Sequence, residues 1–163
     1  MQNWNSLRVK VSAGLIVLTL LILMSSVMNY QALITMSNNS IRFSGTLLPA
    51  EQAVLNGDRD LYQALQAEQE ALLLVDPSQL SKVKADFDEN AQQARDRMHT
   101  FLKLMADYPE VTARFADFDQ QFAAWHTPSN EMFALLAAGD ATKARAIHEA
   151  ADTQFATLRG IYN

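Results

Sequence analysis

The chain has 163 residues, of which 49% are hydrophobic and 19% charged, with no cysteine and a formal net charge of −5. A chain of this length suits one domain with a single core. The absence of cysteine excludes disulfide scaffolds and cysteine-ligated zinc sites. The acidic balance argues against nucleic acid as a partner, because nucleic-acid binding needs a clustered Lys/Arg surface.

The first part of the chain contains a long uncharged segment. From Val11 to Met28 the sequence reads VSAGLIVLTLLILMSSVM, and no charged residue follows before Arg42. A helix needs about 20 predominantly apolar residues to cross the hydrocarbon core of a bilayer. The sequence therefore predicts a transmembrane helix over residues 11–34.

The charges around this segment predict its orientation. Arg8 and Lys10 directly precede it, whereas all 18 acidic residues follow it. By the positive-inside rule, residues 1–10 form a cytoplasmic tail and residues 35–163 are exported. A cleaved signal peptide is the alternative. No small-x-small cleavage site follows Met24, which favours an uncleaved signal anchor.

Three breaks divide the chain into four helical segments. Each break combines residues that end one helix or begin the next: Asp76-Pro77-Ser78, Tyr108-Pro109-Glu110 and Ala138-Gly139-Asp140. The predicted helices cover about residues 6–75, 77–107, 109–138 and 141 onward. Pro128 lies inside the third helix, where we expect a kink and not an end.

Apolar residues recur at steps of three and four in the last three segments. They are Phe87, Ala91, Ala94, Met98, Phe101 and Met105 in the second, Val111, Phe115, Phe118, Phe122 and Trp125 in the third, and Ala151, Phe155, Leu158 and Tyr162 in the fourth. This spacing is typical of the seam of a left-handed helical bundle. The sequence predicts an all-α fold, with a transmembrane helix continuing into an antiparallel up-down-up-down four-helix bundle.

The first helix carries two adjacent apolar stripes. One contains Ile41, Leu48, Leu55 and Tyr62, and the other contains Leu47, Val54, Leu61 and Val75. One stripe is enough to pack against the other three helices, so the second leaves a surface for another copy of the chain. Alternatively, both stripes form one wider core face within a single chain, and the sequence favours neither possibility.

The fourth helix is shorter than the others. From Ala141 to Asn163 it has about 23 residues, against about 30 in the second and third helices. We therefore expect the fourth helix to be truncated and the bundle over residues 35–163 to be incomplete at its C-terminus.

Taken together, an anchor with a cytoplasmic start, a long first helix and three further helices resemble the sensor domain of a bacterial methyl-accepting chemotaxis receptor. Two stretches add to this resemblance. NGDRDLYQAL at residues 56–65 is similar to the polar-aromatic motif on the first helix of many such sensors, and LAAGDATKAR at residues 136–145 looks like the turn joining their last two helices.

The resemblance implies the ligand-sensing portion of a chemotaxis receptor in the bacterial inner membrane, with a periplasmic bundle. It also implies a homodimer through the first helix, a small-molecule or binding-protein ligand, and a cytoplasmic kinase and adaptor as partners. Related bundles precede histidine kinases and cyclases, so these outputs are alternatives. A membrane-tethered helical scaffold without a small-molecule ligand is another.

No pattern in the sequence indicates catalysis, a cofactor or a metal. His99, His126 and His148 lie on three different predicted helices. His148 and Asp152 have the i,i+4 spacing of a metal-binding pair, but we expect a solvated ion pair there. The sequence has no Gly-rich phosphate loop and no nucleophile elbow. We therefore expect no enzymatic activity.

Candidate ligand-binding residues are few. In relatives that bind amino acids, Arg residues on the distal first helix hold a carboxylate, which suits the guanidinium fork. No Arg occurs between Tyr62 and Val75, so that pocket is not carried over. Arg59 with Tyr62 is the candidate polar floor of an interhelical pocket, and a solvated pair of Arg59 with Asp58 or Asp60 is the favoured alternative. Weaker candidates are Arg95, Thr142 and Arg145.

The same end of the predicted bundle is acidic. Glu68 and Glu70 lie on the first helix, and Asp76 and Asp140 lie in two of the breaks. Together these four residues form an alternative site for a cation or a polyamine.

Overall fold

The computed structural model describes residues 7–162, and all regular secondary structure in that range is helical, as predicted. The chain forms two compact units, Met1–Ser44 and Gly45–Asn163. The predicted tail over residues 1–10 falls mostly on residues 1–6, which lie outside the described range. A π-helical turn, η1 (Phe43–Leu47), includes the boundary between the units.

The first unit contains helix α1 (Leu7–Arg42), in which no residue is buried. Some of its hydroxyl groups bond to its own backbone: Thr19 Oγ1 donates to the carbonyl of Leu15 (2.9 Å) and Ser26 Oγ to that of Ile22 (2.8 Å). Such bonds satisfy polar groups where no water is present. The helix that starts at Leu7 is, among the described residues, the one long and apolar enough to cross a membrane, and a signal sequence would meet the same criteria.

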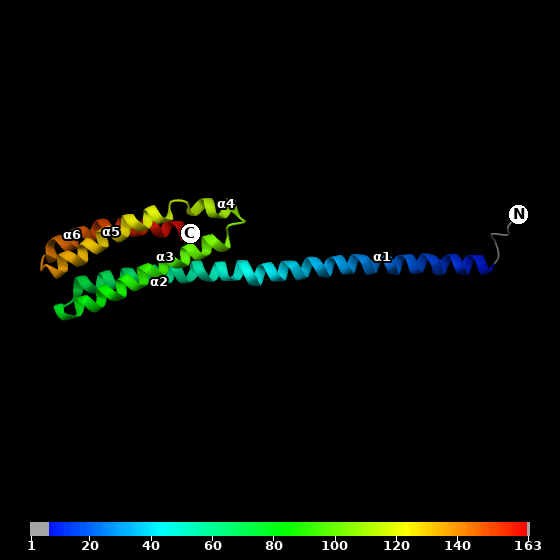
Figure 1. Ribbon diagram of the computed structural model, residues 1–163, viewed down its shortest axis with the longest axis horizontal. Helices are drawn as coiled ribbons and strands as arrows, with labels where there is room; N and C mark the ends of the chain where they lie inside the picture. Colours follow the sequence, from blue (N-terminus) through cyan, green and yellow to red (C-terminus); the bar gives the residue numbers. More distant parts are fainter. Residues whose placement is uncertain (1–6, 163) are drawn as a thin grey trace. The chain divides into compact units, whose positions relative to one another are not determined.

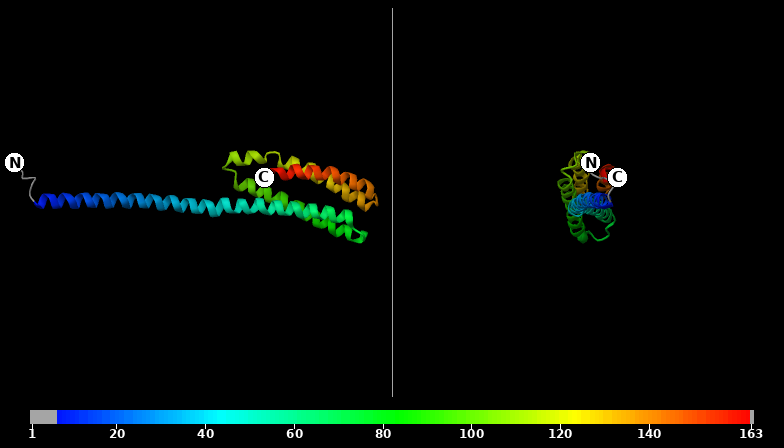
Figure 2. Two further views of the ribbon diagram at one scale, coloured as in Figure 1. Left: turned by 180° about the vertical axis from the view of Figure 1, so that it is seen from behind. Right: turned by 90° about the vertical axis from the view of Figure 1, so that its right-hand side faces the viewer.

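The second unit is a four-helix bundle made of two antiparallel hairpins. Its helices are α2 (Leu48–Leu73), α3 (Leu80–Leu104), α5 (Phe118–Ala137) and α6 (Ala141–Arg159). Helices α2 and α3 form one hairpin and α5 and α6 the other, and both hairpin turns lie at the same end of the bundle (Figures 1 and 2). The predicted bundle is therefore confirmed.

The predicted breaks act as helix caps. Asp76 Oδ1 accepts from the backbone N–H of Ser78 (3.0 Å) at the start of the short 3₁₀-helix η2 (Pro77–Gln79). Gly139 has a φ of 80°, which favours glycine because it has no Cβ, and it follows the end of α5. Asp140 Oδ1 then accepts from the N–H of Lys143 (3.1 Å) and caps α6.

The third predicted helix differs from the structure. Instead of one helix from Pro109, there is a short helix α4 (Pro109–Thr112), a 3₁₀ turn η3 (Ala113–Phe115) and then α5. The interruption lets Phe115 pack edge-on against Phe101, with ring centroids 4.9 Å apart, while Phe118 is buried in the core. Pro128 lies inside α5, which continues to Ala137 as predicted.

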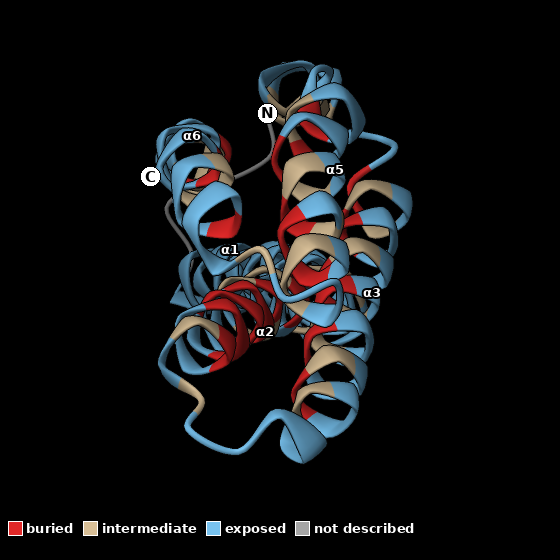
Figure 3. Cartoon of the chain, turned by 90° about the vertical axis from the view of Figure 1, so that its left-hand side faces the viewer, coloured by how far each residue is buried: buried red, intermediate tan, exposed pale blue. Residues whose placement is uncertain are grey.

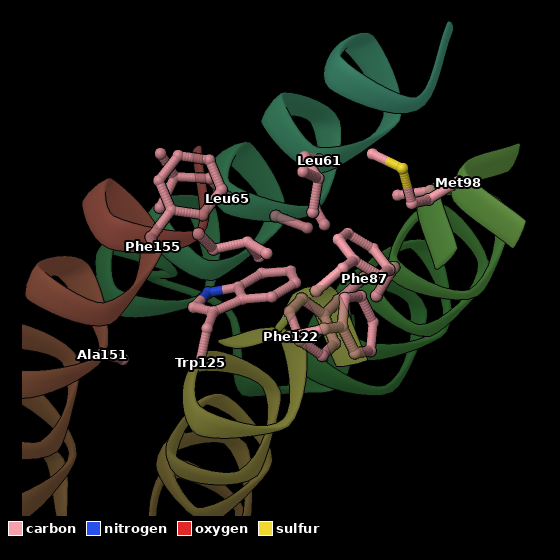
Figure 4. Close-up of a cluster of buried hydrophobic side chains, with 14 of the residues drawn as sticks. Leu61, Leu65, Phe87, Met98, Phe122, Trp125, Ala151 and Phe155 are labelled. Carbon is pink, nitrogen blue, oxygen red and sulfur yellow. The ribbon is translucent and has the colours of Figure 1, made fainter. Parts of the chain in front are cut away.

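The core of the bundle is formed by the inward faces of its four helices. Figure 3 shows the buried residues of α2, α3, α5 and α6 on the sides that face one another. Trp125 lies at the centre, with its ring 5.5 to 5.6 Å from those of Phe87, Phe122 and Phe155 (Figure 4). The core cluster includes the predicted seam residues Phe87, Ala91, Ala94, Met98, Phe101, Met105, Phe118, Phe122, Ala151, Phe155 and Leu158.

The two apolar stripes of the first predicted helix have different environments. Leu61 is buried, and Leu47 and Val54 pack against the core. Leu55, from the other stripe, is 62% exposed, and Leu48 is also exposed. Val75 lies beyond the end of α2 and is exposed, so it does not extend the inner stripe. Within one chain, Leu48 and Leu55 are therefore not part of a wider core face, whereas Tyr62 of the same stripe packs edge-on against the core residue Phe155.

Candidate functional site

Helix α2 has acidic side chains on its inner face at two levels, Asp60 and Glu68. Both residues are completely buried. A buried carboxylate is costly unless it is paired and hydrogen-bonded, so the partners of these two groups organise the surrounding helices. We call the first level the Asp60 cluster, which consists of Asp58, Arg59, Asp60, Tyr62, Arg97, Arg159 and Tyr162. The second level is the Glu68–His148 pair.

Asp60 lies between two guanidinium groups. Its Oδ1 accepts from Nε (3.0 Å) and Nη2 (2.7 Å) of Arg59, the next residue along α2. Its Oδ2 accepts from Nε of Arg97 on α3. Charge-assisted hydrogen bonds of this kind are about twice as strong as neutral ones. Asp60 therefore ties α2 to α3 inside the first hairpin.

Asp58 connects α2 to the last helix. Arg159 of α6 donates from Nε to Oδ1 of Asp58 (3.0 Å) and from Nη2 to Oδ2 (3.2 Å). These bonds raise the pKa of the Arg159 guanidinium above its ordinary value. The same guanidinium lies 4.5 Å from the ring centre of Tyr62, which in turn packs edge-on against Phe155. The cluster therefore joins both hairpins.

Tyr162, in the 3₁₀ turn η4 (Gly160–Tyr162), completes this cluster. Its hydroxyl is buried and has no hydrogen-bond partner among the described residues. Burial raises the pKa of the phenol, and the negative charges of Asp58 and Asp60 act in the same direction. A Cβ added to Gly57 would lie 3.5 Å from this hydroxyl, an ordinary van der Waals contact, so Tyr162 lies directly over this position of α2.

The Glu68–His148 pair joins α2 to α6 closer to the hairpin turns. Oε2 of Glu68 lies 3.3 Å from Nδ1 of His148, although the angles do not fit a hydrogen bond. The nearby carboxylate raises the pKa of the imidazole above its ordinary value, while burial lowers it. The ion pair that we expected between His148 and Asp152 is thus replaced by one across the bundle, because His148 lies on the inner side of α6 with 16% of its side chain exposed.

The first-choice ligand residues, Arg59 and Tyr62, lie within the Asp60 cluster. The Arg59 side chain is 54% exposed and is bonded to Asp60, one of the partners given in the alternative, but the Asp60 carboxylate is completely buried and not solvated. Tyr62 contacts Arg159 and Phe155. Because Arg59 uses two of its five N–H groups on Asp60, the exposed guanidinium retains donors for an anion.

The weaker candidates lie in two other places. Arg95 of α3 binds Asp119 of α5 through Nε (3.0 Å) and Nη2 (2.9 Å). Although burial raises the pKa of Asp119, the hydrogen bonds from Arg95 and His99 hold it below its ordinary value. Thr142 and Arg145 are exposed at the start of α6. The structure does not bring these three residues together with Arg59 and Tyr62.

The four residues of the alternative cation site contact different partners and do not form one cluster. Glu68 is buried against His148, whereas Glu70 is exposed on α2. Asp76 and Asp140 cap their helices, and the hydrogen bonds from Ser78 and Lys143, respectively, lower the pKa of each carboxyl. Residues 7–162 contain no group of three or more His, Asp or Glu side chains that could hold a metal ion.

A family model described as a four helix bundle sensory module for signal transduction matches residues 3–160. The chain belongs to this family of sensory modules. The resemblance indicated by the sequence motifs is thereby confirmed, as is the fold that it implies. No curated protein and no solved structure matches the chain.

Sequence reasoning missed the partners that organise the polar core of this sensory module. Arg97, Arg159 and the buried position of Asp60 were not predicted. Asp60 lies seven residues after Ala53 and seven before Ala67, and both alanines are buried. Residues seven positions apart lie on nearly the same side of a helix, so this spacing could have identified Asp60 as buried.

Proposed function

We propose that the chain is the ligand-sensing portion of a transmembrane chemotaxis receptor. The observation that carries this proposal is the family match over residues 3–160, supported by the apolar helix that begins at Leu7. In this arrangement residues 1–10 are cytoplasmic, residues 11–34 cross the bacterial inner membrane once, and the bundle over residues 35–163 is periplasmic. The bound state of the bundle is passed to a cytoplasmic module with a kinase and an adaptor as partners.

The proposed ligand is an anionic small molecule that contacts Arg59. The exposed Arg59 guanidinium offers a charge-assisted and planar contact to a carboxylate, and Tyr62 follows three residues later on the same helix. A ligand transmits a signal only if it binds one of two helix arrangements more tightly than the other. Arg59 suits this role because its partner Asp60 also binds Arg97, so a ligand on Arg59 would act on the link between α2 and α3.

A hybrid receptor tests the proposed function. Residues 1–163 are joined to the second span and signalling part of a chemoreceptor with a measurable kinase output. Cells that lack other receptors then receive acids, amino acids and amines that do not cross the membrane. We expect at least one compound to change kinase output, because the periplasmic bundle would bind it. If no compound or added periplasmic protein changes the kinase output of a well-expressed hybrid, the sensory function is contradicted and a membrane-tethered scaffold is the better assignment.

Replacing Arg59 with alanine separates a ligand contact from a structural ion pair. If Arg59 binds the anion, the loss of about 1.5–3 kcal/mol weakens apparent affinity 10- to 150-fold. The melting temperature should change little, because Arg59 is more than half exposed and Arg97 still pairs with the buried Asp60 carboxylate after the substitution. Dose–response curves of the hybrid measure the affinity, with exposed Arg114→Ala as the control. If the response of Arg59→Ala is unchanged, Arg59 has only a structural role. If Glu70→Gln loses a response to amines, the alternative cation site is favoured.

We propose a homodimer through the exposed stripe of α2. Leu48 and Leu55 are exposed in a single chain, and burying them against a second copy removes apolar surface from water. Because the chain has no cysteine, a single Leu55→Cys substitution provides a specific probe. We expect oxidation in membranes to cross-link Leu55→Cys efficiently and the control Asp96→Cys, exposed on α3, poorly. Equally poor cross-linking of both variants would contradict this dimer.

A further inference from the structure

The Glu68–His148 pair is the one buried acid–histidine contact that the described residues show between the two hairpins of the bundle. Glu68 comes from α2 and His148 from α6, and Oε2 of Glu68 lies 3.3 Å from Nδ1 of His148. The carboxyl group is completely buried, and neither of its oxygens has a hydrogen-bond partner among the described residues. A buried carboxylate in this situation depends on the charge of its neighbour.

Charged groups on several helices act on the proton of His148. On α6 itself, Glu149 and Asp152 favour the protonated imidazole, as does Glu68 from α2. From α5, His126 also feels the charge of Glu68, but burial lowers the pKa of its own imidazole. His126 is stacked between two phenylalanine rings, and its other charged neighbours are Lys84, Asp88 and Arg95 of α3. His126 is therefore neutral over a pH range in which His148 is charged.

We propose that the bundle senses protons through Glu68 and His148, so that the external hydrogen-ion concentration is itself an input of the receptor. When His148 carries its proton, the ion pair holds α6 against α2. When that proton is released to water, Glu68 is left buried without a counter-charge, and the contact between the hairpins loosens. This inference rests on the proposed sensory function and gives it a second ligand class, the proton.

The direction of the effect follows from the shift at His148. Its pKa is raised above the ordinary 6.5, because the charged form gains Glu68 as a partner in the folded state. The stabilisation is fully present below pH 6.5 and is lost as the pH rises through the raised pKa. Acidic conditions therefore favour the tied arrangement, and alkaline conditions favour the loosened one.

Histidine NMR on the whole chain in lipid nanodiscs tests the pair directly. We expect His148 to titrate above its ordinary value and above His126. Glu68→Gln should lower the His148 value by about 1–3 pH units, because the opposite charge has been removed. Glu70→Gln is the matched control, since Glu70 is exposed on the same helix. An ordinary titration of wild-type His148 overturns the proposal without requiring that any variant fold. Equal effects of the two folded variants overturn it as well.

A distance measurement tests whether the proton changes the helix arrangement. Spin labels at Gln66→Cys on α2 and Thr153→Cys on α6 are placed at exposed positions of a chain that has no other cysteine. We expect the distance distribution to broaden as the pH rises from 6.5 through the raised pKa of His148. His148→Gln and Glu68→Gln should abolish this pH dependence. An unchanged wild-type distribution, or a change retained in both variants, overturns the proposal.

The hybrid receptor then separates this inference from the proposed function. A pH step that changes kinase output in the wild type but not in His148→Gln supports both. If compounds trigger the hybrid but a pH step does not, proton sensing fails and the sensory function stands. If the labelled bundle responds to pH but the hybrid responds to no input, proton sensing by the receptor fails together with the proposed function, and only the local titration stands.

Discussion

Replacing Trp125 with alanine is expected to lower the free energy of unfolding of the bundle by about 3–5 kcal/mol, the usual cost of truncating a fully buried tryptophan. Trp125 is completely buried and packs against Phe87, Phe122 and Phe155, so its ring contacts side chains of α3, α5 and α6 (Figure 4). The cavity left behind would border three of the four helices. Urea unfolding of the whole chain in detergent, followed by far-UV circular dichroism, measures the effect.

Two further variants make this result specific. Trp125→Phe should cost less than Trp125→Ala, because it keeps a ring in place and removes an indole N–H that has no partner among the described residues. Leu73→Ala, at an exposed position of α2, should change stability by no more than about 0.5 kcal/mol. A loss below about 1 kcal/mol for Trp125→Ala would contradict the position of Trp125 at the centre of the core.

The fold could be predicted because its signals are local. Asp76 and Asp140 have side chains that reach a backbone N–H two or three residues away, so a cap is visible in a few consecutive letters. Gly139 similarly marks a turn by its own backbone conformation. The broken start of the third predicted helix was missed because it depends on Phe115 packing against Phe101 of another helix. Between Pro109 and Phe118, packing between helices therefore outweighs the continuous helical pattern of the sequence.

The polar core could be predicted only in part, because its partners are distant in sequence. The bond between Asp58 and Arg159 joins residues 101 positions apart and depends on which side of α6 faces α2. Glu68 had a local signal: the inner stripe of α2 continues from Val54 through Leu61, and Glu68 occupies the next position seven residues on. A gap in an apolar stripe filled by an acid indicates a buried charge, and such a charge needs a partner on another helix.

Replacing Asp60 with asparagine is expected to lower the free energy of unfolding by about 1.5–3 kcal/mol, the usual value of a hydrogen bond to a charged group. The substitution keeps the shape of the side chain and removes the charge shared by Arg59 and Arg97. Arg97 is about one-third exposed, so water can partly solvate its guanidinium, and we expect the lower half of this range. Urea unfolding of the whole chain measures the change, with Asp86→Asn, exposed on α3, as the matched control.

A double-mutant cycle decides which arginine makes Asp60 important. Asp60→Asn and Arg97→Gln should show a coupling energy of about 0.5–3 kcal/mol, because their side chains are in direct contact between α2 and α3. Asp60→Asn and Arg59→Ala should couple more weakly, since Arg59 is more exposed and its ion pair joins neighbours on one helix. Stronger coupling to Arg59 than to Arg97 would contradict this assignment. The buried carboxylate would then serve to orient Arg59 for a ligand, and its main effect would be on affinity.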